Sequence, residues 1–100
     1  MSNKFGLSAE VIEKVLDVFA KHPEIYQVVI YGSRAKGNYK AGSDIDLTLK
    51  GSKELDMEVL YQVIGELDEL NLPYTFDVSL YNSITNKDLI DHIDRVGVDF

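Results

Sequence analysis

The chain has 100 residues, of which 45% are hydrophobic, and its formal net charge is −7. This length predicts a single domain over residues 1–100 with one core. The absence of cysteine excludes disulfides and thiolate metal sites and leads us to expect a cytoplasmic protein. The 17 acidic residues exceed the 10 basic residues, which disfavours a nucleic-acid partner, because nucleic-acid-binding proteins present basic patches.

The sequence gives no sign of membrane insertion or secretion. No apolar run approaches the ~18 residues of a transmembrane helix, so we expect no membrane partner. Met1-Ser2-Asn3-Lys4 is followed by no long apolar segment, so we expect no signal peptide.

The first predicted element is a helix that begins after Ser8 and runs to Ala20. Serine is a favoured N-cap residue, and apolar side chains then recur at helical spacing. This stripe consists of Val11, Ile12, Val15, Leu16 and Phe19. The helix must end before Pro23, because proline disfavours helical backbone in the residue before it. The pattern predicts a surface helix packed on a sheet.

A predicted strand over residues 25–31 leads directly into a glycine turn. The strand is rich in β-branched and aromatic residues, and Gly32-Ser33 ends it. A short helix should begin at Arg34, since the next residues are good helix formers. Free backbone N–H groups at a helix start attract phosphate, and Gly32 allows a close approach. Ser33 adds a hydroxyl donor, so this turn is a candidate phosphate-binding site.

Residues 44–50 alternate in polarity and predict a second strand. Asp44 and Asp46 fall on one face, opposite the apolar residues. Two carboxylates placed in this way repel each other unless a hard cation lies between them. Mg²⁺ is commonly held by one or two carboxylates together with substrate phosphates. The pair therefore indicates phosphoryl or nucleotidyl transfer.

Two more helices and a third strand follow. A broad apolar face predicts a helix over residues 52–70, and alternation predicts a strand over residues 74–80. Asp77 is the lone acid of that strand. A last helix is expected over residues 86–96. Three strands separated by helices predict a small α/β (α+β) sheet with helices on one face and the acids on the open face, although strand directions do not follow from the pattern.

The stretch from Gly32 to Leu47 resembles the signature of the minimal nucleotidyltransferases, in the DNA polymerase beta-like superfamily. That signature is Gly-Ser, ten residues, then Asp-x-Asp; here it is Gly32-Ser33 followed by Asp44 and Asp46. The group includes MntA-type antitoxins encoded beside HEPN-domain toxins. The resemblance implies a mixed sheet and a single nucleotidyltransferase domain.

The resemblance also implies roles for individual residues. Gly32 and Ser33 would bind the phosphates of ATP or another NTP, and Asp44 and Asp46 would bind Mg²⁺, with two ions in the complete site. The family has a third carboxylate on a later strand, which would be Asp77, as a metal ligand or as the base. Arg34 is assigned to nucleotide binding as well, and Arg34 or Lys36 either steadies the triphosphate or is simply solvated.

Nothing in the sequence forms an obvious base-specific pocket or acceptor site. We therefore expect another chain to complete the site, either a second copy or a helical HEPN-type protein. The predicted reaction is transfer of AMP to a hydroxyl of that protein with release of pyrophosphate. The alternatives are transfer to a small molecule, and a non-catalytic antitoxin that occludes its helical partner.

Overall fold

The computed structural model describes residues 4–100, in which four strands form one mixed sheet with the order β3-β2-β1-β4. β1 (Ile25–Tyr31) pairs antiparallel with β2 (Ile45–Gly51), and β2 pairs parallel with β3 (Phe76–Leu80). Residues 1–3, on which the expected absence of a signal peptide partly rests, lie outside the described residues. None of the helices in the described chain is long and apolar enough to cross a membrane.

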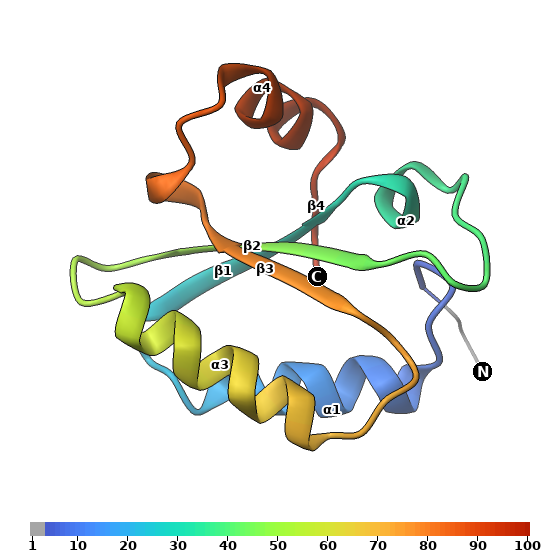
Figure 1. The fold of residues 1–100 in the computed structure, drawn as a ribbon, viewed down its shortest axis with the longest axis horizontal. Helices are drawn as coiled ribbons and strands as arrows, with labels where there is room; N and C mark the ends of the chain where they lie inside the picture. Colours follow the sequence, from blue (N-terminus) through green and yellow to red (C-terminus); the bar gives the residue numbers. More distant parts are fainter. Residues whose placement is uncertain (1–3) are drawn as a thin grey trace.

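Two helices cover one face of the sheet, as the apolar stripes predicted. α1 (Ala9–Ala20) and α3 (Met57–Glu69) lie side by side below the sheet in Figure 1. The main core lies between them and the sheet, where the alternating residues Ile45, Leu47 and Leu49 of β2 are almost fully buried. The predicted α/β fold with a mixed sheet is confirmed.

The starts of the helices follow from local capping. Ser8 caps α1 as predicted, since its side chain accepts a hydrogen bond from Val11 N at 3.2 Å. α3 begins at Met57 and not at Ser52, because the Asp56 carboxylate accepts a hydrogen bond from Val59 N at 3.1 Å and caps the helix there.

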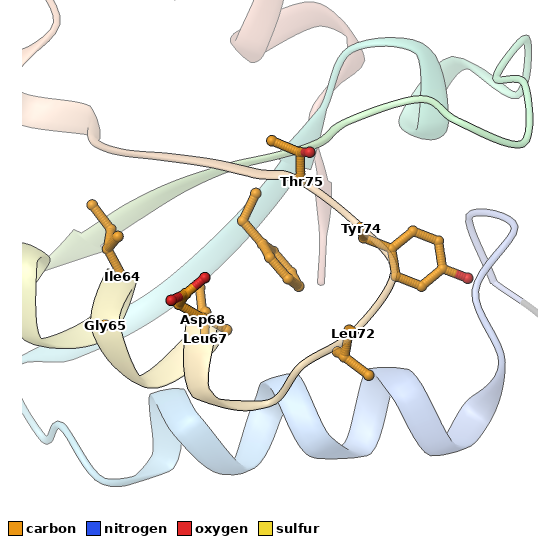
Figure 2. A pocket seen from close by; sticks show the side chains of 8 residues that line it. Ile64, Gly65, Leu67, Asp68, Leu72, Tyr74 and Thr75 are labelled. Carbon is orange, nitrogen blue, oxygen red and sulfur yellow. The ribbon is translucent and has the colours of Figure 1, made fainter.

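The connection from α3 into β3, residues 70–75, borders a cavity at the edge of the sheet (Figure 2).

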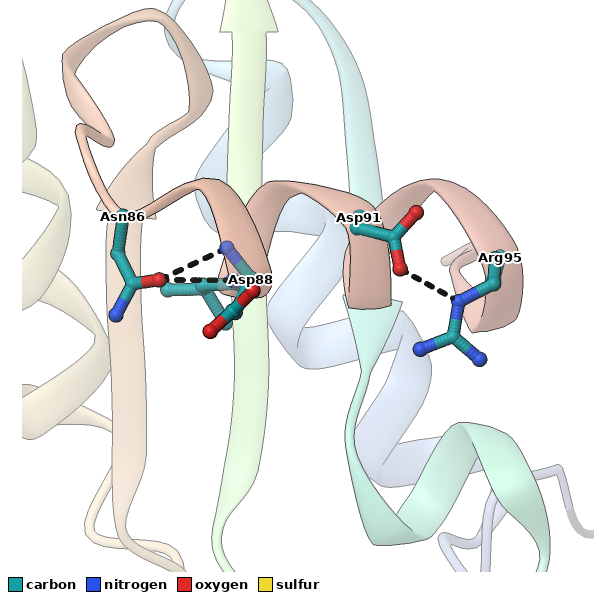
Figure 3. A network of polar contacts seen from close by, with 5 residues as sticks. Asn86, Asp88, Asp91 and Arg95 are labelled. Atoms are coloured by element: carbon teal, nitrogen blue, oxygen red, sulfur yellow. Dashed lines mark hydrogen bonds and ion pairs between the residues drawn. The ribbon is translucent and has the colours of Figure 1, made fainter.

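The last helix, α4 (Lys87–Val96), lies on the opposite face of the sheet, where only the acids were expected. It begins at the cap residue Asn86, whose side chain accepts hydrogen bonds from two backbone N–H groups, and Arg95 pairs with Asp91 at 2.9 Å (Figure 3). Ile93 is 2% exposed and packs with Val29 and Tyr31 of β1. Alternation in β1 places these two apolar residues away from the main core, so they need a cover of their own.

Two short elements complete the fold. α2 (Ser33–Lys36) follows β1 directly, and a 3₁₀ turn (Tyr81–Ser83) follows β3. The chain after α4 forms β4 (Val98–Asp99), which pairs antiparallel with β1. Backbone pairing with β1 explains this strand better than its own sequence does, because it is only two residues long.

Candidate active site

The predicted carboxylates meet on the upper face of the sheet, the face opposite α1 and α3 in Figure 1. Asp46 and Asp77 are register partners in the parallel pair of β2 and β3. Asp44 lies just before β2 and two residues from Asp46, so alternation turns it to the same face. The strand of Asp77 therefore lies beside the strand of Asp46, and Asp44 precedes that strand directly.

The glycine turn lies against this acid cluster. Tyr31, the last residue of β1, is the register partner of Asp46, and Gly32 follows it. A Cβ atom at Gly32 would lie 2.3 Å from Oδ2 of Asp46. Gly32 also has φ +76° and ψ −156°, a conformation that is essentially restricted to glycine. Glycine is therefore needed here to let the Asp46 carboxylate approach, in addition to the predicted approach of phosphate.

The carboxylates at this site repel one another. Burial raises the pKa of Asp46, and the neighbouring carboxylates of Asp77 and then Asp44 raise it further, while His92 lowers it. Burial also raises the pKa of Tyr31. A hydrogen bond from Ser79 lowers this pKa, and the carboxylates of Asp77 and Asp46 raise it further. A folded chain that disfavours ionisation of Asp46 gains from a cation at this position.

The donor set suits a cation that brings ligands of its own. Within residues 4–100, no three acidic or imidazole side chains are arranged so that they could by themselves hold a metal ion. Mg²⁺ does not require such a cage, because it keeps waters and commonly takes one or two carboxylates plus substrate phosphates. The Asp46 and Asp77 carboxylates on adjacent strands meet that requirement.

α2 lies where the sequence placed the phosphate site. Lys36 N donates to Gly32 O at 3.1 Å, and Gly37 N donates to Ser33 O at 2.9 Å, so a regular helical turn starts at Gly32. The first N–H groups of such a turn have no partner within the helix. Ser33 is only half-buried and lies at the start of this turn, and its contact with phosphate stays a prediction.

Arg34 occupies a structural position. Its side chain is 3% exposed and donates to Ser43 O from both Nε, at 3.2 Å, and Nη2, at 2.9 Å. Nη1 donates to Phe5 O at 2.9 Å, and the guanidinium lies over the rings of Tyr39 and Tyr74. These contacts fasten the loop that leads into Asp44. Its assignment to nucleotide binding stays a prediction.

His92 is a residue of this site that the sequence did not reveal. The ring stands edge-on to Tyr31, with centroids 6.1 Å apart, close enough for its charge to influence Asp46. Only the packing of α4 over β1 produces this proximity, and no spacing of acids or histidines in the sequence could have indicated it.

The comparison with protein families decides the identity of the domain. The family described as polymerase beta, nucleotidyltransferase, matches residues 13–99, which include every site residue discussed above. The chain belongs to the polymerase beta nucleotidyltransferase family. The predicted enzyme class, a nucleotidyltransferase, is thereby confirmed. A search of curated proteins gave no match.

Solved structures share the fold of this nucleotidyltransferase domain. A toxin–antitoxin complex with AMP-PNP has a TM-score of 0.71 and 19% identity over 87% of this chain and 69% of its own. A tri-AMPylated Shewanella oneidensis HEPN toxin in complex with its MNT antitoxin gives 0.66 and 16%, over 90% and 68%. A Sulfolobus solfataricus protein gives 0.57 and 26%, over 91% and 77%.

Proposed function

We propose that this nucleotidyltransferase transfers AMP from ATP to a side-chain hydroxyl of a helical HEPN-type protein and so acts as an antitoxin. The observation that supports this most directly is the contact of Gly32 with Asp46, beside Asp77. It joins the two halves of the signature, a phosphate-binding turn and a carboxylate pair, in one place. A pure binding module has no need of that arrangement.

In the proposed reaction the acceptor oxygen attacks the α-phosphorus of ATP. The bond from the α-phosphorus to the bridging oxygen of the β-phosphate breaks, and pyrophosphate leaves. The start of α2, with Ser33, binds the β- and γ-phosphates and orients the leaving group. Asp77 on β3 is exposed whereas Asp46 is half-buried, so an incoming hydroxyl can reach Asp77, to which we assign the acceptance of its proton.

Asp44 and Asp46, with Asp77, are the residues that would hold Mg²⁺. When bound, the cation neutralises triphosphate charge and the repulsion among these acids. The position of the Asp46 carboxylate is fixed by its place on β2 and by the close approach of Gly32. Arg34 contributes indirectly, since it fixes the Ser43 carbonyl that precedes Asp44.

The choice of a protein acceptor is supported by charge and by related complexes. The net charge of −7 disfavours a nucleic acid, as argued above. Two of the solved complexes with this fold are toxin–antitoxin pairs, and one of them contains an AMPylated HEPN toxin. Those complexes make a HEPN-type protein the partner to test first.

The test is to incubate the chain with Mg²⁺, ATP and the protein encoded by the adjacent gene, and then to weigh that protein by intact mass spectrometry. We expect the mass to rise by one AMP residue or a multiple of it. Asp77→Asn should slow transfer by roughly 10²-fold or more with ATP affinity changed only a few-fold, the effect typical of a lost general base. Asp17→Asn on α1, also exposed, is the matched control and should transfer normally.

Other outcomes would identify the alternatives. An unmodified partner that is nevertheless bound and silenced would refute catalysis and favour occlusion. Transfer to a small molecule in place of the protein would refute the acceptor. Equal rates for Asp77→Asn and the control would show that Asp77 is only an exposed strand residue.

A further inference from the structure

A groove lies at the β3 edge of the sheet, next to the candidate active site. The second half of α3, the connection that follows it and Phe76, the first residue of β3, line a cavity of about 360 Å³. Figure 2 shows Ile64 and Asp68 on α3 at one side of this cavity, and Leu72, Tyr74 and Thr75 on the connection at the other side. Apolar side chains therefore line a depression that remains open to solvent in the described chain.

An exposed apolar stripe on α3 leads into this groove. Met57, Tyr61 and Ile64 are 45%, 66% and 42% exposed, and Ile64 also lines the cavity. Their spacing of four and three residues places them on one side of the helix, away from the buried side that contains Val63 and Leu67. Core packing does not account for them, and contiguous exposed apolar surface marks interaction sites.

The charge around the stripe limits what can bind there. α3 contains four acidic residues, namely Glu58, Glu66, Asp68 and Glu69, and no lysine or arginine. Glu66 is already paired with His22 at 2.7 Å, whereas Asp68 lines the cavity. A second copy of this chain would bring the same acids to face themselves. A partner with apolar anchors flanked by lysine or arginine is complementary to the surface.

The groove adjoins the candidate active site through two structural links. Thr75 and Asp77 lie on one face of the chain that enters β3, about 7 Å apart along the strand. Within residues 4–100 the only strand beside β3 is β2, so its outer edge is open. Tyr74 also lines the cavity, and its ring centroid lies 5.2 Å from the guanidinium carbon of Arg34, which holds the loop before Asp44.

We propose that the stripe from Met57 to Ile64 and the adjoining cavity form the docking site for the protein acceptor of this enzyme. The partner places an amphipathic helix along α3, inserts an apolar anchor into the cavity and sets basic side chains beside Asp68. Its acceptor hydroxyl then crosses the open edge of β3 and reaches Asp77 on the upper face. This assignment rests on the proposed transfer to a protein and defines the surface that selects the acceptor.

The test compares two tyrosines with similar exposure. Tyr61→Glu introduces a charge in the middle of the stripe, and Tyr26→Glu, at a β1 residue that is 75% exposed, is the matched control. The probe is the purified product of the adjacent gene, titrated without ATP by calorimetry. We expect Tyr61→Glu to raise Kd by about 30-fold or more, the loss typical of an interface hot spot. Tyr26→Glu should stay within about twofold of the wild type, and circular dichroism should show both variants folded.

A second variant tests the charge. Asp68→Lys should raise Kd and make it less sensitive to salt, because it removes an attraction to the basic partner. Equal Kd values for Tyr61→Glu and Tyr26→Glu would overturn the docking site, as would a wild-type chain that self-associates through Tyr61 or does not bind the probe. Binding that depends on Tyr61 without any AMP transfer would support the docking site and refute the proposed function. AMP transfer that proceeds normally in Tyr61→Glu would support the proposed function and refute the docking site.

Discussion

Replacing Gly32 with alanine tests the contact that joins the two halves of the site. The alanine would be held at φ +76° and ψ −156°, which costs about 1–3 kcal/mol. Its Cβ would lie 2.3 Å from Oδ2 of Asp46, so this carboxylate must leave its rotamer, at about 0.5–1.5 kcal/mol more. Together these changes predict a loss of about 2–4 kcal/mol, or a drop in Tm of roughly 10–25 °C for a domain of this size.

Gly37→Ala is the matched control. Gly37 also has a positive φ, of +88°, but a Cβ there would meet nothing within 4 Å. Its loss should be limited to backbone strain of about 1–2 kcal/mol. The assay is thermal unfolding of both variants, followed by calorimetric titration with Mg²⁺ and ATP. Gly32→Ala should lose nucleotide binding, because Asp46 is displaced, and Gly37→Ala should bind within a few-fold of wild type.

The double variant Gly32→Ala/Asp46→Ala separates collision from strain. Measured against Asp46→Ala alone, the added Gly32→Ala change should cost about 1 kcal/mol less than it costs in the wild type, since residues in direct contact are energetically coupled. The reasoning is refuted if Gly32→Ala costs no more than Gly37→Ala, or if it costs as much in the Asp46→Ala background as in the wild type.

Three further variants test the electrostatics and the packing. The folded-state pKa of Asp46 is raised above 3.8, by burial first and then by neighbouring carboxylates, so its ionisation lowers stability as the pH rises through that pKa. Asp46→Asn should therefore raise Tm at pH 7 in metal-free buffer and give no gain at pH 3; an equal gain at both would contradict this. Arg34→Lys loses the planar fork that binds two carbonyls. It should speed chymotrypsin cleavage in the 37–44 loop, whereas Lys36→Arg should not. Glu66→Ala leaves the buried His22 ring without its partner and should cost about 1–3 kcal/mol in urea unfolding, more than Glu66→Gln; equal costs would contradict the hydrogen bond.

The sequence by itself predicted most of the elements and the enzyme class of this nucleotidyltransferase, because both depend on residues close together along the chain. Ser8 and the apolar stripe after it are sufficient to define α1, and alternation is sufficient to define β2. The same alternation puts Asp44 and Asp46 on one face. Strand context together with the family resemblance is sufficient to make Asp77 a candidate for the site.

The tertiary structure decided how those elements meet, because the contacts involved join segments that are distant in sequence. Strand pairing alone sets Asp46 opposite Asp77, and the turn after β1 brings Gly32 against the same carboxylate. The side of the sheet that α4 covers depends on which apolar residues of β1 the main core leaves unburied, and His92 comes near the acids only as a result. Local sequence patterns do not determine which strands pair or which face a helix covers. The need to bury the apolar residues on both faces of the sheet determines them.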